Sequence, residues 1–334
     1  LFMRNLVLIC LMALSSFSFA DTVNVYSFRQ PFLIEPILES FTQETGIKAK
    51  VIFAKKGLIQ RIKREGKLSP ADVVLTSNFS KLLQLKTDGL TQTANIKGDI
   101  ENNVPAQFRD SEGHWVALTK RVRNIYSSKE RQGKLDINYE DLASAQYKGK
   151  ICTRSGKHPY NLGLIASMIA HNGEAQTKTW LQGVKNNLAR KPQGNDRAQV
   201  KAIKEGLCDI SLGNSYYLGK MLNDKKQIPW ANAVELNFPN QANRGSHINV
   251  SGAVIAKHSP NKQAAQALLN YLTTEKAQAL YAELNMEYPV NKAVAPSKLV
   301  SSWGTFKEDD IKLEDVAANI KTALKLTDQT KFDL

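Results

Sequence analysis

Residues 22–75 carry the pattern that decides the fold class. Three strand patterns occur in this stretch, TVNVY at residues 22–26, IKAKVIF at 47–53 and ADVVL at 71–75. Between them, apolar residues recur at helical spacing over residues 33–41 and 58–62, and Gly46 follows the first run as a helix stop. This order of strand, helix, strand, helix and strand predicts a parallel sheet with helices on both faces.

The second half of the chain restarts the alternation. Strands are predicted at residues 150–153, 208–212 and 250–256, and helices at 161–170, 175–188, 199–205, 262–272 and 275–284. No repeat or long linker separates the halves. We therefore expect two doubly wound α/β domains, residues 21–118 plus 247–298 and residues 119–246 plus 299–334. A ligand cleft would lie between them, at the carboxyl ends of strands.

The first 20 residues are typical of a secretory signal peptide. Arg4 precedes an uncharged apolar run from Leu6 to Leu14, and small residues ending in Ala20 follow. The run is too short to cross a bilayer, and no later stretch is apolar enough to do so. We expect cleavage after Ala20 and export to a bacterial periplasm of a protein that is not membrane-embedded.

Three tyrosines follow predicted strands. Tyr216 and Tyr217 come just beyond the apolar residues 210–212, and Tyr160 follows the strand at 150–153 in the same way. Oxygen ligands suit hard cations. Only a strongly acidic ion such as Fe3+ would ionise several phenols, with a pKa of about 10, near neutral pH. The alternative is that these tyrosines are half-buried packing residues with a hydrated hydroxyl.

Each tyrosine segment also carries a cysteine. Cys152 precedes Tyr160 by eight residues, and Cys208 precedes Tyr216 by eight. In an oxidising compartment the two form either a disulfide, worth up to about 4 kcal/mol, or a pair of buried thiols. A thiolate metal site lacks support, because the sequence has no Cys-x-x-Cys and no neighbouring cluster of cysteine and histidine.

The charge of the chain suggests an anion rather than a nucleic acid. The formal net charge is +14, and it falls to +13 without Arg4. The basic runs at 55–56 and 61–64 are interleaved with apolar helix positions and have no aromatic stacking platform. Export also makes nucleic acid a poor partner. A bound anion would explain why a positively charged protein holds a cation.

The enzyme motifs that we tested are absent. The sequence contains no Gly-x-Gly-x-x-Gly, no phosphate loop and no His-Glu-x-x-His. The segment from Gly213 begins like a nucleophile elbow, but Tyr217 stands where the closing glycine belongs. The five histidines are dispersed. We therefore expect no catalysis.

The chain resembles the ferric-ion-binding periplasmic proteins of bacterial iron ABC importers over nearly all of residues 21–334. The segments that carry the resemblance are 25–29 (VYSFR), 41–48 (FTQETGIK), 69–73 (SPADV), 154–161 (RSGKHPYN), 213–217 (GNSYY), 251–254 (SGAV) and 259–261 (SPN). The resemblance implies a periplasmic-binding-protein fold, similar to one lobe of transferrin. It also implies Fe3+ ligands at Tyr160, Tyr216 and Tyr217, a monomer, and delivery of the metal to an inner-membrane ABC permease.

Two departures from this family shape the expected site. Many members place a histidine, often followed by a tyrosine, after the arginine of the first loop, where this chain has Gln30 and Pro31. Others supply a glutamate where this chain has Ser77. The chain therefore resembles the subgroup that uses three tyrosines and completes the coordination with an anion, carbonate or bicarbonate.

The anion would be held by residues from several segments. Arg29 offers a planar guanidinium fork and Gln30 an amide. Ser155 and Gly156 precede a helix, whose free N–H groups favour anions. The resemblance adds three residues with a role at the anion or behind the ligands: Asn214, Asp196 and Arg197. The alternative to an iron receptor is a binding protein for an organic or inorganic anion without metal.

Overall fold

The computed structural model describes residues 22–334, so the predicted signal peptide and its cleavage site lie outside the described residues. These residues form a mixed sheet whose main path runs β2-β1-β3-β9-β5-β7-β6. The strands of this path are β1 (Thr22–Ser27), β2 (Lys48–Phe53), β3 (Val73–Thr76), β5 (Val116–Ser128), β6 (Ile151–Cys152), β7 (Ile210–Asn214) and β9 (Ile248–Ala256). Three short strands pair alongside it: β4 (Thr91–Gln92), β8 (Val234–Asn237) and β10 (Tyr288–Pro289).

The first half of the sheet has the predicted parallel arrangement. Strand β1 pairs in parallel with both β2 and β3. Crossover helices α1 (Glu35–Thr45) and α2 (Leu58–Glu65) connect these strands. Gly46 ends α1 with a positive φ of 73°, a conformation that a side chain disfavours. The strands predicted within residues 22–26, 47–53 and 71–75 are therefore confirmed.

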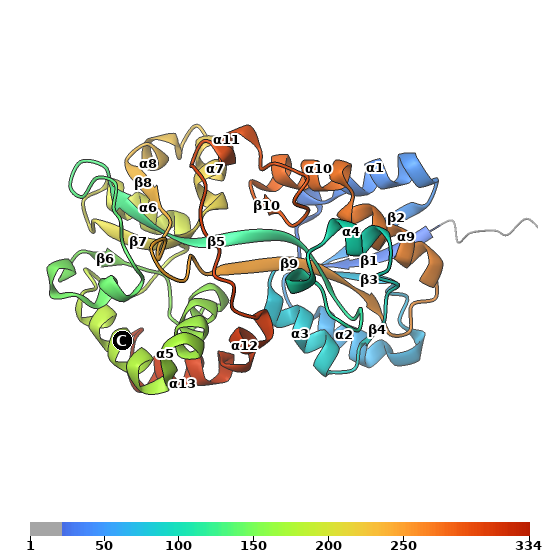
Figure 1. The fold of residues 1–334 in the computed structure, drawn as a ribbon, viewed down its shortest axis with the longest axis horizontal. Coiled ribbons are helices and arrows are strands. Elements are labelled where there is room, and N and C mark those ends of the chain that lie inside the picture. Colours follow the sequence, from blue (N-terminus) through green and yellow to red (C-terminus); the bar gives the residue numbers. More distant parts are fainter. Residues whose placement is uncertain (1–21) are drawn as a thin grey trace, which may run out of the picture.

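Two long strands join the halves of the molecule. Strand β5 pairs with β9 from Val116 to Val122, and from Arg123 onward with β7 and β8. Figure 1 shows β5 and β9 running through the middle of the molecule from one lobe to the other. The sequence analysis did not predict β5, because all but one of its thirteen residues are buried whether polar or apolar. Its sequence therefore lacks the usual alternation.

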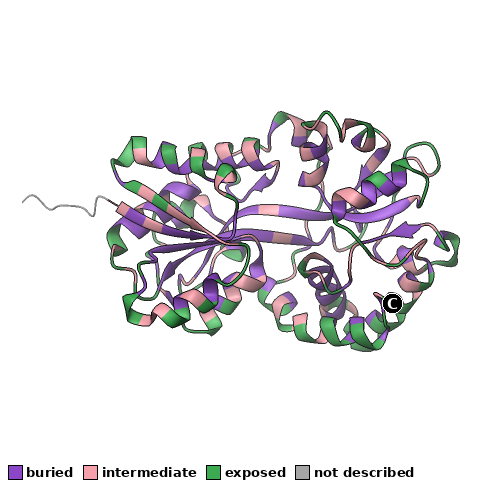
Figure 2. Cartoon of the chain, turned by 180° about the vertical axis from the view of Figure 1, so that it is seen from behind, coloured by how far each residue is buried: buried purple, intermediate pink, exposed green. Residues whose placement is uncertain are grey.

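The hydrophobic core is divided in the same way. One cluster gathers buried residues from 23–122 with others from 248–313. Two further clusters gather residues from 125–236 and from 316–332. Figure 2 shows the buried strands inside and the exposed outer faces of the helices. None of the described helices has the length and apolar character needed to cross a membrane.

The remaining helices cover the two lobes. They are α3 (Phe79–Thr87), α4 (Asp99–Asn103), α5 (Pro159–Asn186), α6 (Asp196–Lys204), α7 (Tyr216–Leu222), α8 (Ile228–Ala231), α9 (Lys262–Thr273), α10 (Glu275–Asn285), α11 (Lys298–Ser301), α12 (Leu313–Ala318) and α13 (Ile320–Gln329). The helices predicted at 161–170 and 175–188 form one element, α5, which Gly173 interrupts with φ 78° and ψ 167°. Helix α13 lies along α5 (Figure 1).

The two cysteines form a disulfide. Cys152 ends β6, Cys208 lies just before β7, and their Cα atoms are 5.8 Å apart. Strands β6 and β7 are parallel neighbours, with Ile151 opposite Ile210. This pairing decides between the two alternatives that the sequence left open.

Candidate metal centre

The three tyrosines meet in the structure. The hydroxyl oxygens of Tyr160 and Tyr216 are 3.2 Å apart. The ring centroids of Tyr216 and Tyr217 are 4.2 Å apart. Tyr160 begins α5, which follows β6, and the pair begins α7, which follows β7. Because parallel strands end at the same edge of a sheet, the pairing of β6 with β7 explains why residues 56 positions apart in the chain meet.

The environment of Tyr216 and Tyr217 keeps these two phenols neutral in the absence of a cation. Burial raises the pKa of Tyr216 well above its usual value, and the neighbouring Tyr160 and Tyr217 raise it further. Burial, followed by the charges of Tyr160 and Asp196, also raises the pKa of Tyr217. These two phenols therefore resist ionisation, whereas a trivalent cation beside them would replace their protons.

Several cationic side chains surround this tyrosine cluster. The guanidinium carbons of Arg121, Arg123 and Arg154 lie 5.7, 5.9 and 5.2 Å from the ring centroid of Tyr160. Arg121 and Arg123 are two residues apart on β5 and therefore share a face of the strand. Sequence analysis missed both, because it did not recognise β5 as a strand.

Two further cations lie beside the other phenols. Arg197 is 6.0 Å from the ring centroid of Tyr217, and it donates a long 3.5 Å hydrogen bond to Gln227. Lys220 Nζ is 5.3 Å from the ring centroid of Tyr216. Burial lowers the pKa of Lys220; the charges of Arg29, Arg197 and Arg121 lower it further, and that of Glu287 opposes them.

Asp196 lies behind the tyrosines in a buried ion cluster. Its Oδ2 accepts from Arg123 at 2.6 Å and its Oδ1 from Arg154 at 3.2 Å. The backbone N–H of Asn214 also donates to Asp196, and the side-chain oxygen of Asn214 accepts from Arg123. Asp196 and Asn214 thus tie α6 and the end of β7 to the arginines of β5 and of the Tyr160 loop.

Arg29 is engaged by a carboxylate from a distant part of the chain. Its two terminal nitrogens donate to Glu287 at 3.0 and 2.7 Å, and to Asn285 and Thr119 at 3.2 and 3.3 Å. Both charged residues are buried. Burial alone would raise the pKa of Glu287, but the Arg29 guanidinium holds it below the usual value. Gln30, the next residue, is exposed.

Ser155 and Gly156 face the C-terminal end of the chain. The hydroxyl of Ser155 and the backbone N–H of Gly156 donate to the two carboxylate oxygens of Asp333, at 2.5 and 2.7 Å. A Cβ at Gly156 would approach the ring of Phe332 to 2.7 Å, so this close packing requires glycine. The expected anion donors thus bind an anionic group from the protein itself.

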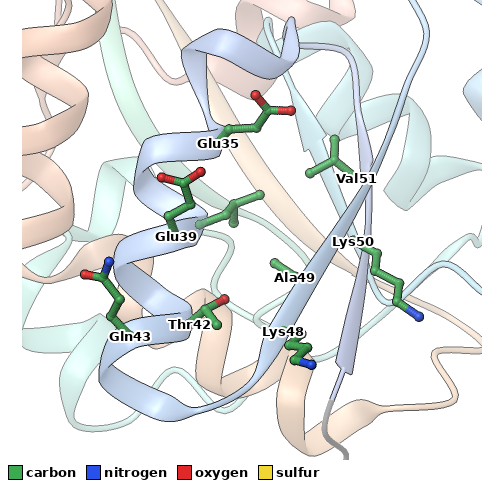
Figure 3. A pocket seen from close by; sticks show the side chains of 9 residues that line it. Glu35, Glu39, Thr42, Gln43, Lys48, Ala49, Lys50 and Val51 are labelled. Atoms are coloured by element: carbon green, nitrogen blue, oxygen red, sulfur yellow. The ribbon is translucent and has the colours of Figure 1, made fainter.

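Two other features of the described residues could resemble binding sites, a groove and a cluster of potential metal ligands. The groove, of about 640 Å3, lies between α1 and the edge strand β2; Glu35 and Glu39 line it from α1, and the Lys50 side chain points away from that helix (Figure 3). It belongs to the lobe opposite α5 and α7 (Figure 1). Its open, mixed-charge walls offer no convergent set of ligands.

The second is a cluster of potential metal ligands at Asp110, Glu112 and His114. Lys86 pairs with both carboxylates, at 2.6 and 3.2 Å. The hydroxyl of Thr91 lies 2.8 Å from His114 Nδ1. These partners already satisfy the cluster, so the tyrosine cluster remains the stronger candidate for a metal centre.

Comparison with known proteins relates the chain to bacterial extracellular solute-binding proteins. Residues 49–306 match the family of bacterial extracellular solute-binding proteins. Iron uptake protein A1 of Synechocystis is 39% identical over 312 residues, which are 92% of this chain and 86% of that protein. The fold predicted from the sequence is confirmed by the solved structures below.

Two of these structures extend over almost the whole chain. Ferric iron-binding protein A of Mannheimia haemolytica, in an open conformation, is 58% identical with a TM-score of 0.91, over 94% of this chain and 100% of that one. A Trichodesmium protein (IdiA, FutA) in complex with iron and citrate ligands is 37% identical with a TM-score of 0.88, over 93% of this chain and 99% of that one.

Proposed function

The chain belongs to the family of bacterial extracellular solute-binding proteins, and we propose that it is the periplasmic ferric-iron receptor of an ABC importer. The observation that carries the proposal is the meeting of three phenols at the ends of two adjacent strands, with two hydroxyls 3.2 Å apart. The relatives named above support it, because their names or structures involve iron or its uptake. The role requires no catalysis.

In this proposal Tyr160, Tyr216 and Tyr217 bind Fe3+ as phenolates. Three phenolates balance the charge of the ion, and their oxygens are the hard donors that it prefers. The helix α5, with Tyr160 in its first turn, adds a favourable dipole for a phenolate. A carbonate ion would complete the coordination and leave a net negative centre. The arginines around Tyr160 balance that charge.

The supporting residues divide into two groups. Asp196 and Asn214 fix the arginines and the strand end behind the phenols. Arg29, Gln30, Ser155, Gly156 and Arg197 remain candidates for contact with the anion. For Arg29, Ser155 and Gly156 such a contact requires exchange of their present carboxylate partners, Glu287 and Asp333.

Export and delivery complete the proposal. Cleavage after Ala20 would release a monomer that carries iron through the periplasm to an inner-membrane permease. Residues 21–118 plus 247–298 and residues 119–246 plus 299–334 would act as two domains about β5 and β9. Since the proposed metal ligands all come from one of them, loading need not close the other domain over the iron.

A second function is favoured by the excess of cations around the phenols. Arg121, Arg154, Arg197 and Lys220 would suit a receptor for an anion without metal. A titration separates the two functions. Metal-free protein is titrated with a ferric chelate, with and without bicarbonate, and the visible absorbance is followed. A ferric-phenolate band supports the iron receptor; a colourless protein that binds only the anionic chelator overturns it.

A further inference from the structure

We propose that Lys220 is the cation that directly contacts the anion bound with iron, an assignment that rests on the proposed function. The anion is a small planar oxyanion of the carbonate class. The sequence analysis assigned this role to Arg29 and to the donors before α5. The structure gives those groups other partners and leaves the ammonium of Lys220 beside the phenols.

The position of Lys220 follows from the geometry of α7. Lys220 comes four residues after Tyr216, so both side chains lie on the same face of the helix. Its Nζ atom lies over the Tyr216 ring, 5.3 Å from the centroid. An anion that shares a metal ion with the Tyr216 oxygen is therefore within reach of this flexible side chain.

Lys220 lacks a partner among the described residues. No hydrogen bond or ion pair of the described part of the chain involves its Nζ, although the residue is partly buried. Ammonium groups removed from water are normally paired, because desolvation of an unpaired charge is unfavourable. The carboxylate of Glu287 attracts the ammonium, whereas Arg29, Arg197 and Arg121 repel it and add to this cost. A bound anion would relieve both.

Four of the other cations around the phenols have closer hydrogen-bond or ion-pair partners, whereas Arg197 beside Tyr217 makes only a 3.5 Å hydrogen bond to Gln227. Arg29 binds Glu287, and Arg123 and Arg154 share Asp196. Arg121 donates to the backbone oxygens of Ser77 and Val250. Ser155 and Gly156, the neutral donors, hold the carboxylate of Asp333. Lys220 can engage an anion without breaking any of these contacts.

The helix that carries Lys220 also meets the other lobe. A Cβ at Gly219 would lie 2.8 Å from the Met286 side chain, so the backbone of α7 packs directly against that residue. Met286 immediately precedes Glu287, the partner of Arg29. An anion held by Lys220 would thus lie on the side of the cluster that faces the first lobe.

The test is the dependence of iron binding on bicarbonate in Lys220→Gln, Lys220→Arg and the wild type. Lys225→Gln is the matched control, because it removes the same charge from an exposed lysine five residues away. Each protein is titrated with a ferric chelate at increasing bicarbonate concentrations. The bicarbonate midpoint is the concentration at which the visible band reaches half of its full intensity. We expect Lys220→Gln to raise the bicarbonate midpoint at least about tenfold, the effect of losing one charged hydrogen bond.

The other variants show whether the effect depends on a positive charge at position 220. The band of Lys220→Gln should recover at high bicarbonate by mass action. Lys220→Arg should stay within a few-fold of wild type, and Lys225→Gln should match it. A Lys220→Gln midpoint equal to that of Lys225→Gln overturns the inference, as does a wild-type band that is independent of bicarbonate. A wild type without any ferric band instead contradicts the proposed function itself.

Discussion

The guanidinium of Arg29 and the carboxylate of Glu287, 258 residues apart in the chain, form a buried bidentate ion pair with a shortest contact of 2.7 Å. Thr119 and Asn285 complete the hydrogen bonds of the Arg29 head. The pair fastens the loop after β1 to the segment after α10. Because the charges of Arg29 and Glu287 cancel, the pair adds no net charge to the surroundings of the phenols.

Removing one partner of this pair should destabilise the fold. Arg29→Ala leaves the Glu287 carboxylate buried without its counter-ion, a change that costs roughly 3–5 kcal/mol in other proteins. Urea unfolding of the metal-free protein measures it. Lys276→Gln is the control, because Lys276 and Glu44 form an exposed pair, and its urea midpoint should barely move. If Arg29→Ala has wild-type stability but a shifted bicarbonate midpoint, Arg29 contacts the anion and does not stabilise the fold through Glu287.

The same pair should make stability sensitive to acid. Because the folded-state pKa of Glu287 lies below its unfolded value, the pair contributes stability above that unfolded value, near 4.5. The contribution is lost as pH falls through the folded pKa. The difference in unfolding free energy between wild type and Glu287→Gln should therefore shrink as pH falls below about 4.5. A constant difference between pH 7 and pH 3 would contradict this linkage.

Acid should also release the iron. The pKa values of Tyr216 and Tyr217 are raised, so metal-free phenols keep their protons, and each phenolate ligand must lose one when iron binds. The metal-free state therefore binds more protons and is favoured as pH falls. If iron binding releases three protons, the apparent iron affinity should fall up to about a thousandfold for each unit by which the pH is lowered. Chelator competition between pH 8 and pH 5 measures the slope; a flat profile excludes phenolate ligands.

Reduction of the disulfide should lower stability more than iron affinity. The bond between Cys152 and Cys208 closes a loop with a sequence separation of 56 residues. The chain-entropy relation gives about 4 kcal/mol for a loop of that length. Urea unfolding with and without a reductant, alongside the Cys152→Ser/Cys208→Ser variant, provides the measurement. Equal midpoints in both redox states would show that the bond adds no stability.

The C-terminal residues should stabilise the loop that leads to Tyr160. Phe332 is buried against Gly156, and Asp333 binds the two donors before α5. Phe332→Ala should cost about 3–5 kcal/mol, as for other buried aromatic residues. Leu334→Ala, at an exposed position, is the control. A Phe332→Ala variant that unfolds at the urea concentration of Leu334→Ala would contradict the packing described here.

The sequence predicted those features that depend on local pattern. The strands within residues 22–75 alternate in hydrophobicity or are wholly apolar, so their parallel pairing follows from the helices between them. The tyrosines of the cluster were predicted because each follows a short strand. The parallel pairing of β6 and β7 then brings their ends together.

Features that depend on distant partners were not predictable in this way. Strand β5 is buried on both faces by the two lobes, so Arg121 and Arg123 gave no amphipathic signal. Ser155 binds Asp333, which lies 178 positions away in the chain, and Arg29 binds Glu287, which lies 258 positions away. Local sequence shows the donors at these positions, but only the tertiary structure shows which acceptor reaches them.

The visible spectrum of the iron-loaded protein tests the central claim most directly, in wild type, Tyr216→Phe, Tyr217→Phe and Tyr160→Phe. Tyr147→Phe is the control, because it removes a hydroxyl from the same lobe outside the cluster. We predict that each cluster variant folds, loses or strongly weakens the ferric-phenolate band, and loses more affinity than the roughly 10- to 100-fold that an outer-shell change costs. Tyr147→Phe should match wild type. Full colour and one iron per chain in all three cluster variants would contradict the account.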